Sequence, residues 1–274
     1  MNARLLGWAG VQLRADGSGI VIDPLRDAAA VWAPAGDLAR DVPLPPVVAA
    51  EPSGAAAAGL LTHLHRDHAD VDALREALRP GAVVLVPAQF GGDEVEDSAV
   101  ADARDELEAS GLAVREVAWW ESMDVDGWRI TALPAADGTG DPQVSWLVQR
   151  DGATVLHAGD TLPHNWWWRI ARRAGGRIDV AFLPINAPTV MFPHRQPPIA
   201  RPIVMDGREA ATAAAVLRAG RVVPIHYDGY DWEPIYTPDR RALETLRAAA
   251  GELDVPVEVP ELGAWFDVAE RVAA

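Results

Sequence analysis

Cysteine is absent from the 274-residue sequence. Its absence excludes disulfide bonds, thiolate nucleophiles and zinc sites built from cysteine side chains. A chain without disulfides leaves the compartment open, although it fits the reducing cytoplasm, and we expect a cytoplasmic protein.

Positive charge is scarce as well. Lys and Arg number 24 against 40 Asp and Glu, so the formal net charge is −16 at pH 7. Such a surface repels phosphate groups, which argues against nucleic acid as the main partner, although bound metal ions can reverse the charge locally. No uninterrupted apolar run reaches the roughly 20 residues of a membrane span, and the first residues lack the apolar core of an export signal, so we expect neither.

What is present is ordinary for a soluble globular protein with a real core: 49% hydrophobic and 23% charged residues. The patterns of apolar and turn residues predict strands first and then strand–helix alternation, twice over. This order indicates an α/β (α+β) protein in which two sheets pack face to face with helices outside, as one domain over residues 1–274. Helices are expected at residues 70–79, 101–109, 163–173, 207–219 and 239–250, and strands at 11–13, 20–22, 55–61, 82–86, 112–117, 128–133, 144–149, 154–157, 180–183 and 222–225, with two short ones near Val255 and Trp265.

Residues 25–54 form the longest stretch without a periodic pattern. They are rich in Ala and Pro, which resists regular structure. We expect a long surface excursion that carries one large aromatic side chain, Trp32. A loop of this length inside a compact domain is usually functional or mobile.

Four side chains able to bind a divalent metal fall close together after the apolar run 55–61: His63, His65, Asp67 and His68. The first two are two positions apart, so in an extended chain they point to the same side. Asp67 and His68 follow at the turn, where the backbone can direct their side chains at a second metal position close to the first. Imidazole nitrogen and carboxylate oxygen suit zinc, manganese or iron. The alternative is a set of solvated polar residues at a helix N-terminus, with Asp67 as the cap.

Two further signals follow downstream. Asp160 comes just after the apolar strand 154–157, and His226 leaves the apolar strand 222–225. Taken alone, the first could cap a helix and the second could be an ordinary core histidine. Together with the first cluster they give six ligands. Two divalent ions roughly 3.5–4 Å apart need about that many when one carboxylate is shared.

These segments resemble the metallo-β-lactamase-fold hydrolases. Residues 62–68 look like that superfamily's His-x-His-x-Asp-His signature, residues 157–161 resemble its Gly-Asp-Thr segment, and residues 224–227 resemble its final histidine motif. Residues 6–10 and 22–24 are also similar to the opening of the branch that includes ascorbate-6-phosphate lactonase. The resemblance runs through most of the chain. It implies a four-layer αββα sandwich of two mixed β-sheets, with helices on both outer faces and metals at one edge.

The resemblance also implies two divalent metal ions, with zinc as the first choice and manganese or iron as alternatives. His63 and His65 would hold one ion, Asp67, His68 and His226 would hold the other, and Asp160 would lie between them.

One departure concerns the first ion: Asp137 stands where relatives carry a third histidine. A carboxylate can still ligate and would make the site harder, which shifts its preference toward manganese or iron. The other interpretation is that Asp137 only caps the Gly-rich loop 137–140. The first ion would then be held weakly, and the protein could work with one.

The expected activity is metal-dependent hydrolysis. A divalent metal lowers the pKa of a bound water to about 7, which makes a hydroxide available to attack a carbonyl or phosphoryl centre. Asp67 and Asp160 are the candidate catalytic residues, since either carboxylate could orient that water and take its proton.

The substrate is expected to be a small molecule. Three consecutive tryptophans at 166–168 cannot all face the core, because each helical step turns by about 100°. At least one should be exposed near the metals, and the expected substrate-binding residues are Trp166, Tyr227, His164, Asn186 and His194. The alternative is that most of these rings pack between helix and sheet. An aromatic lining and the acidic charge favour a carbonyl substrate (a lactone, ester or amide). The alternatives are a phosphodiesterase of the same fold and a non-hydrolytic, ligand-binding protein with a degenerate first metal site. The sequence also leaves open that the chain forms a homo-oligomer.

Overall fold

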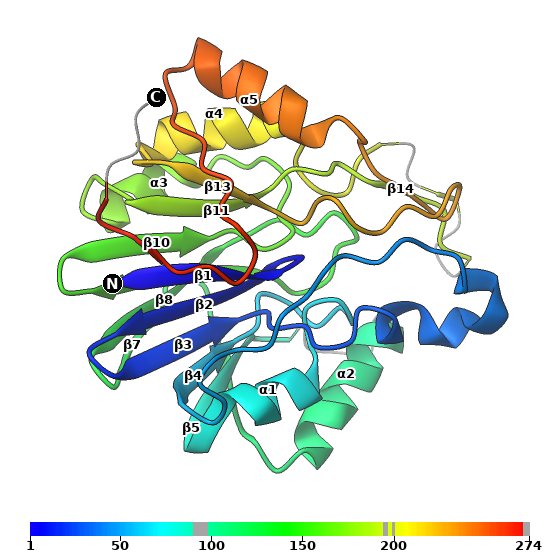
Figure 1. The fold of residues 1–274 in the computed structure, drawn as a ribbon, viewed down its shortest axis with the longest axis horizontal. Coiled ribbons are helices and arrows are strands. Elements are labelled where there is room, and N and C mark those ends of the chain that lie inside the picture. The colour runs from blue at the N-terminus through cyan, green and yellow to red at the C-terminus, as the bar shows by residue number, and fades with distance from the viewer. Residues whose placement is uncertain (90–97, 194–196, 199–200, 271–274) are drawn as a thin grey trace.

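Two β-sheets packed face to face form the centre of the molecule in the computed structural model, which describes residues 1–89, 98–193, 197–198 and 201–270 (Figure 1). The first sheet has the strand order β15–β1–β2–β3–β4–β5–β6, with β15 at Phe266–Asp267, β1 at Asn2–Gly7, β2 at Gly10–Ala15, β3 at Ser18–Ile22, β4 at Ala56–Leu60, β5 at Leu78–Pro87 and β6 at Ala113–Val117. The second has the order β13–β11–β10–β9–β8–β7, with β13 at Val222–Ile225, β11 at Val180–Pro184, β10 at Ala153–His157, β9 at Val144–Arg150, β8 at Trp128–Pro134 and β7 at Ser122–Val125.

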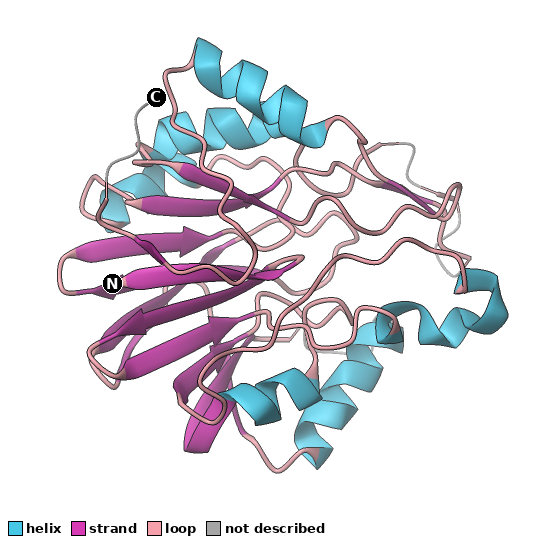
Figure 2. Ribbon diagram, viewed as in Figure 1, coloured by secondary structure: helices cyan, strands magenta, loops and turns pink. Residues whose placement is uncertain are grey.

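Helices cover both outer faces of this pair of sheets (Figure 2). Helices α1 (Val71–Ala77) and α2 (Ser98–Ala109) pack on the first sheet, and α3 (Trp167–Arg173), α4 (Gly207–Leu217) and α5 (Ala242–Glu252) pack on the second. The expected four-layer αββα sandwich of two mixed sheets is therefore confirmed. Among the described residues, no helix has the length and apolar character that crossing a membrane requires.

Alternation of side chains along the strands explains the layering. Ile20 and Ile22 face the core between the two sheets, whereas Val21 faces the core beneath α1 and α2. In the second sheet Val155 faces the inter-sheet core and Leu156 faces the helices. Successive residues of a strand point to opposite faces, so strands covered on both sides need continuous apolar runs.

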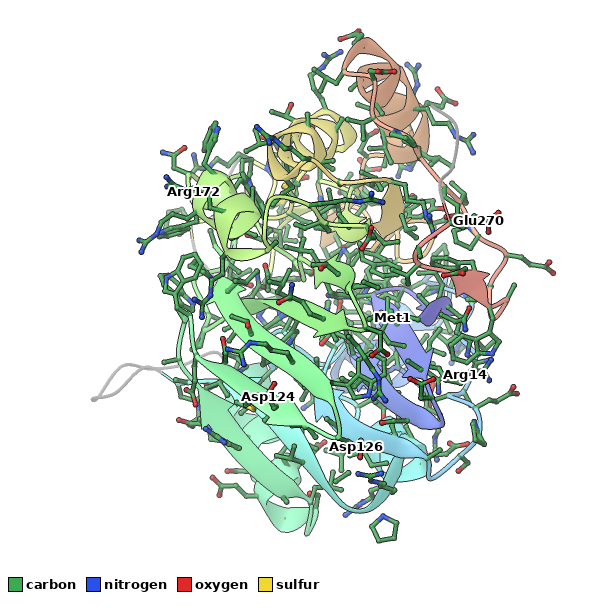
Figure 3. The ribbon with its side chains drawn as sticks, turned by 90° about the vertical axis from the view of Figure 1, so that its left-hand side faces the viewer. Met1, Arg14, Asp124, Asp126, Arg172 and Glu270 are labelled. Carbon is green, nitrogen blue, oxygen red and sulfur yellow. The ribbon has the colours of Figure 1, made fainter. Side chains whose placement is uncertain are left out.

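The strands that precede the predicted ligands run in the same direction. Strands β3, β4, β5 and β6 pair in parallel, as do β10, β11 and β13. Their carboxyl ends therefore emerge at one edge of the sandwich, which is where ligand sites form in sheets of this kind. The opposite end is viewed in Figure 3, where Met1 and the hairpin-turn residue Asp126 lie among scattered charged side chains.

Several boundaries differ from the sequence prediction. Residues 30–39, expected to be irregular, form a short 3₁₀ helix, η1 (Ala30–Ala39), with a kink at Gly36. Helix α3 begins at Trp167, four residues later than expected, and Asp70 rather than Asp67 caps α1 by accepting a hydrogen bond from Ala73 N at 2.8 Å. Strands β1 and β7 were not predicted, nor was the small sheet of β12 (Thr189–Val190) and β14 (Tyr236–Thr237).

Candidate metal centre

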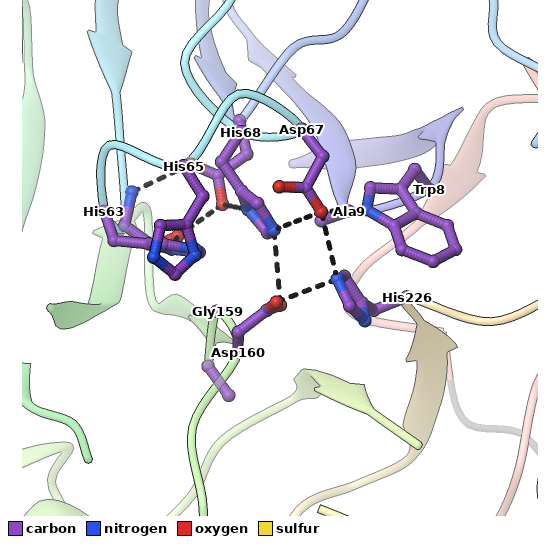
Figure 4. A network of polar contacts seen from close by, with 12 residues as sticks. Trp8, Ala9, His63, His65, Asp67, His68, Gly159, Asp160 and His226 are labelled. Carbon is purple, nitrogen blue, oxygen red and sulfur yellow. Dashed lines mark hydrogen bonds and ion pairs between the residues drawn. The ribbon is translucent and has the colours of Figure 1, made fainter. Parts of the chain in front are cut away.

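Four of the predicted ligands meet at the carboxyl edge of the sheets. Asp67, His68, Asp160 and His226 each offer an atom within 4.8 Å of all the others (Figure 4). His226 Nε2 lies 2.8 Å from one oxygen of Asp160, and His68 Nε2 lies 3.3 Å from the other. These residues follow three different strands, β4, β10 and β13, so only the folded sheets bring them together. We call this set the aspartate-bridged group.

The three remaining predicted ligands form a second set beside it. His63, His65 and Asp137 also offer atoms within 4.8 Å of one another, and the two imidazole rings are 4.3 Å apart at 87°. We call this set the two-histidine group. All seven residues predicted as ligands therefore belong to one of the two groups.

Buried polar atoms without partners show that this arrangement suits a cation. His63 Nε2, His68 Nε2 and Asp160 Oδ1 are buried and make no hydrogen bond. An unpaired buried polar group costs about 1–3 kcal/mol, so three of them in one place need an explanation. Each atom carries a lone pair, and each belongs to a residue of the two groups. Divalent cations would satisfy all three at once, so the residues fit the metal ions that the sequence predicts.

Hydrogen bonds behind the histidines fix which ring nitrogen keeps its lone pair. His68 Nδ1 donates to Asp23 Oδ2 at 2.9 Å, and His226 Nδ1 donates to Asn186 Oδ1 at 2.9 Å. The Thr62 hydroxyl donates to Asp23 Oδ2 at 2.6 Å, so its oxygen accepts from His63 Nδ1 at 3.0 Å. In all three rings Nδ1 therefore carries a proton, and Nε2 is the nitrogen that would bind a metal.

The charged side chains of the aspartate-bridged group shift each other's pKa values. Burial lowers the pKa of His68 and His226, but the carboxylates of Asp160 and Asp67 outweigh it and raise the pKa of both above its usual value. Burial likewise raises the pKa of Asp160, yet the two histidines hold it well below its usual range. Both shifts show that the two carboxylates favour positive charge at this point, which is where a cation would lie.

Asp137 serves two purposes in the structure. Its Oδ1 accepts hydrogen bonds from Thr139 N at 2.7 Å, Thr139 Oγ1 at 2.5 Å and Asp141 N at 3.2 Å, which closes the loop after β8. An oxygen of the same carboxylate lies within 4.8 Å of a ring nitrogen of His63 and of one of His65. The two interpretations of Asp137, ligand and loop cap, are therefore compatible.

Asp141 is a site residue that sequence reasoning missed. Its Oδ2 accepts a hydrogen bond from His65 Nε2 at 2.9 Å, and its side chain is only 8% exposed. Burial lowers the pKa of His65, but this hydrogen bond and the charges of Asp137 and Asp67 raise it to about 9. Asp141 stands before Pro142 in a loop, so nothing in its local sequence distinguishes it from a surface aspartate.

Asp23 and Trp8 were also missed as site residues. Asp23 is fully buried at the end of β3 and, besides the two contacts already given, accepts from Thr62 N at 2.8 Å. Trp8 Nε1 donates to Asp67 Oδ2 at 2.8 Å, and the Trp8 ring lies 4.0 Å from that of His226. Both residues hold ligands in place without belonging to either group.

A cavity of about 530 Å³ opens onto both groups. Its wall includes His65, Asp67, Asp160 and His226 together with apolar side chains from η1, from the segment 188–193 and from the segment 230–236.

Among the described residues predicted to bind substrate, Trp166, His164, Tyr227 and Asn186 do not line this cavity. Trp166 packs against Trp119 with ring centroids 5.1 Å apart, and His164 stacks on Trp167 at 3.8 Å, where burial lowers its pKa to about 4. Tyr227 lines a separate cavity of about 470 Å³.

Asn186 and His194 are the remaining two residues predicted to bind substrate. Asn186 is buried behind His226 and donates to the hydroxyl of Tyr236 at 2.8 Å, so it positions a ligand of the aspartate-bridged group. His194 lies outside the described residues. The aromatic side chains that do line the metal-facing cavity are Trp32, Phe192, Tyr230, Trp232 and Tyr236.

Comparisons with known proteins identify the family. Residues 19–227 match the family described as Beta-lactamase superfamily domain. A UPF0173 metal-dependent hydrolase from Thermococcus kodakarensis is 31% identical over 183 residues, which cover 64% of this chain and 68% of that protein.

Solved structures share the fold. Igni18, a metallo hydrolase from Ignicoccus hospitalis, superposes with a TM-score of 0.63 at 21% identity, over 97% of this chain and 98% of that one. CmlA, a diiron β-hydroxylase from Streptomyces venezuelae, superposes with a TM-score of 0.67 at 16% identity, over 95% of this chain and 53% of that one. These two reactions differ, so the fold alone does not define the chemistry. The sequence matches are more specific, and by them the chain belongs to the beta-lactamase superfamily and, within it, to the UPF0173 metal-dependent hydrolases.

Proposed function

We propose that this chain hydrolyses a small-molecule carbonyl compound, a lactone, ester or amide, with two divalent cations held by the two-histidine group and the aspartate-bridged group. The observation that supports the proposal best is the set of buried, unpartnered atoms His63 Nε2, His68 Nε2 and Asp160 Oδ1 at the edge of a cavity. The resemblance of residues 6–10 and 22–24 to the opening of the ascorbate-6-phosphate lactonase branch adds weight to a lactone.

The ions would supply a reactive water at neutral pH and polarise the oxygen that gains charge during the attack. The chain's own residues supply direction and proton transfer. Asp67 and Asp160 both line the cavity, and nearby histidines keep the pKa of each carboxyl well below its usual range, although burial opposes this. Both are therefore ionised at neutral pH. Because Trp8 holds Asp67 Oδ2, we assign the other oxygen, Asp67 Oδ1, to orient the attacking water and accept its proton.

The donor set bears on which ions bind. The aspartate-bridged group offers two imidazoles and two carboxylates, which suits zinc, our first choice, as well as manganese or iron. The two-histidine group already includes one carboxylate, and a second, Asp141, lies 2.9 Å from His65. With Asp141 included, each group offers two imidazoles and two carboxylates, so manganese or iron is the alternative to zinc at both.

Metal content and substrate panels together test the proposal. Protein purified without chelator should contain two metal equivalents per chain and hydrolyse members of a panel of lactones, esters and amides, whereas chelator should abolish the activity and added metal should restore it. Asp67→Asn should lose turnover while circular dichroism shows a folded protein. Asp124→Asn, a change at a 69%-exposed side chain far from the site, is the matched control.

Two results would overturn the proposal. Loaded protein that cleaves bis-p-nitrophenyl phosphate but no carbonyl compound would establish the phosphodiesterase alternative. Protein that binds no metal and cleaves nothing would establish the ligand-binding alternative.

A further inference from the structure

The walls of the cavity over the candidate metal centre are mostly apolar. Leaving aside the candidate ligands and Thr139, the described lining residues are aliphatic, aromatic or proline, except for Arg66 and Asp102. The two tyrosines in the wall direct their hydroxyls elsewhere, since Tyr230 donates to Ala28 O at 2.8 Å and Tyr236 accepts from Asn186 at 2.8 Å. A ligand in this cavity therefore meets rings and methyl groups.

One wall comes from η1 and is fixed by aromatic contacts. The Trp32 ring meets Tyr230, Trp232 and Tyr236 edge-on, with centroids 5.8, 5.4 and 6.0 Å away. Edge-to-face contacts of this kind are favourable and orient the rings. Trp32 therefore ties residues 30–39 to the opposite wall, so that the cavity is built before a ligand arrives.

At the mouth of the cavity, apolar surface is left open to water. Leu38 lines the cavity and is 80% exposed. Covering such side chains with an apolar ligand gains roughly 25 cal/mol for every Å² removed from water. The same surface gives a small polar ligand nothing to bind.

Charge complementarity also points away from an anionic substrate. Arg66 is the only cationic side chain among the described lining residues, apart from the histidines, and it pairs with Asp102 at 2.7 Å. Two divalent ions would be balanced by the carboxylates of Asp67, Asp137, Asp160 and Asp141, which leaves no net positive charge at the centre. A phosphate or carboxylate on the substrate would therefore find no unpaired counter-charge in this part of the cavity.

We infer that the substrate is an uncharged carbonyl compound with an apolar alkyl or aryl body beside its reacting group, and that Trp32 and Leu38 select this body. The inference rests on the proposed function for the reaction and adds the substrate class. The carbonyl lies over the two ligand groups, and the apolar body extends along η1 toward Phe192 and Trp232.

A homologous series of p-nitrophenyl n-alkanoates, from acetate to decanoate, tests the inference with the full-length, metal-loaded protein. Each methylene buried is worth about 0.8 kcal/mol, so kcat/KM should rise about fourfold per methylene until the cavity is filled. Trp32→Ala should lower kcat/KM for the octanoate about tenfold and flatten the dependence of kcat/KM on chain length. Trp168→Ala, which removes a 58%-exposed indole outside the cavity, is the matched control and should leave the series unchanged.

A binding measurement separates failure of the inference from failure of the proposed reaction. Calorimetric titration with n-alkyl hydroxamic acids should show affinity rising with chain length, and Trp32→Ala should flatten the rise. If affinity rises but no ester, lactone or amide is cleaved, the apolar cavity stands and the proposed hydrolysis is wrong. If esters are cleaved with kcat/KM independent of chain length, or if hydroxamates bind no better as they lengthen, the inferred substrate class is wrong. A charged substituent that improves kcat/KM would also overturn it.

Discussion

Two substitutions of Asp23 test its role in stability and its role in metal binding separately. It is fully buried and accepts three hydrogen bonds: Thr62 N at 2.8 Å, the Thr62 hydroxyl at 2.6 Å and His68 Nδ1 at 2.9 Å. In Asp23→Ala all three donors lose their partner. At about 1.5 kcal/mol or more for each hydrogen bond to a charged group, the loss of stability is about 4–5 kcal/mol. For a chain of this size that lowers Tm by roughly 10 °C or more.

Asp23→Asn should act mainly on the metal. The amide oxygen can still accept from Thr62 N, but an NH₂ group replaces the oxygen that received the Thr62 hydroxyl and His68 Nδ1. The new donor favours the His68 tautomer with its lone pair on Nδ1 and its proton on Nε2, which cannot ligate. Loss of such a supporting contact typically costs 10–100-fold in metal affinity.

The assay is competition with a chromophoric chelator for metal affinity, combined with thermal unfolding with and without metal. Asp124→Asn, whose side chain is 69% exposed and pairs with Arg129, is the control and should match the wild-type chain in both measurements. Wild-type metal affinity in a folded Asp23→Asn variant would refute the argument that Asp23 sets the tautomer of His68.

Three further predictions concern separate parts of the site. Asp137→Ala should lower the metal content measured by mass spectrometry from two equivalents to one, because the aspartate-bridged group stays complete; two tightly bound equivalents would exclude Asp137 as a ligand. Gly159→Ala should destabilise the protein by about 2 kcal/mol or more in urea unfolding, because residue 159 has a φ of +64° and its new Cβ would lie 2.8 Å from Thr62 Cβ; an unchanged midpoint would contradict this geometry. Metal-free protein should lose stability as the pH rises, because the folded pKa of His65, about 9, exceeds the ordinary value of 6.5. The stabilisation from His65 is complete below pH 6.5 and is lost as the pH rises through 9. A Tm that increases over this range in the presence of chelator would contradict this prediction.

Local sequence, read together with the family resemblance, was sufficient to single out the candidate ligands that the fold brings together. His63 and His65 alternate along an extended chain, and Asp160 and His226 follow short apolar runs that can only be buried strands. The sandwich was predictable for the same reason, since apolar runs of strand length separated by helical patterns leave few layered arrangements.

The contacts that support the ligands were not predictable from local sequence. Asp23 meets His68 across 45 positions, and Asp141 meets His65 across 76, so their roles depend on tertiary structure. Strand β1 was missed because Arg4 occupies a core position; it is satisfied there by Gln12 Oε1 at 2.8 Å and Ala49 O at 2.8 Å. Such a buried arginine breaks the apolar pattern on which the prediction of a strand depends.

Two of the residues expected to bind substrate lie away from the cavity for a structural reason. Helix α3 begins at Trp167, so Trp166 and His164 pack against neighbouring tryptophans away from the metal-facing cavity. The cavity is lined instead by Trp32 in η1, within the Ala- and Pro-rich excursion that has no periodic pattern. A long loop inside a compact domain was the signal that pointed there.

The central claim is that two cations share one edge of the sandwich, and anomalous diffraction from crystals of metal-loaded protein tests it most directly. We predict two peaks roughly 3.5–4 Å apart. One should lie beside His63, His65 and Asp137, and the other beside Asp67, His68 and His226, with Asp160 between them. Peaks only at surface carboxylates, or none at either group in protein loaded with excess metal, would contradict the account.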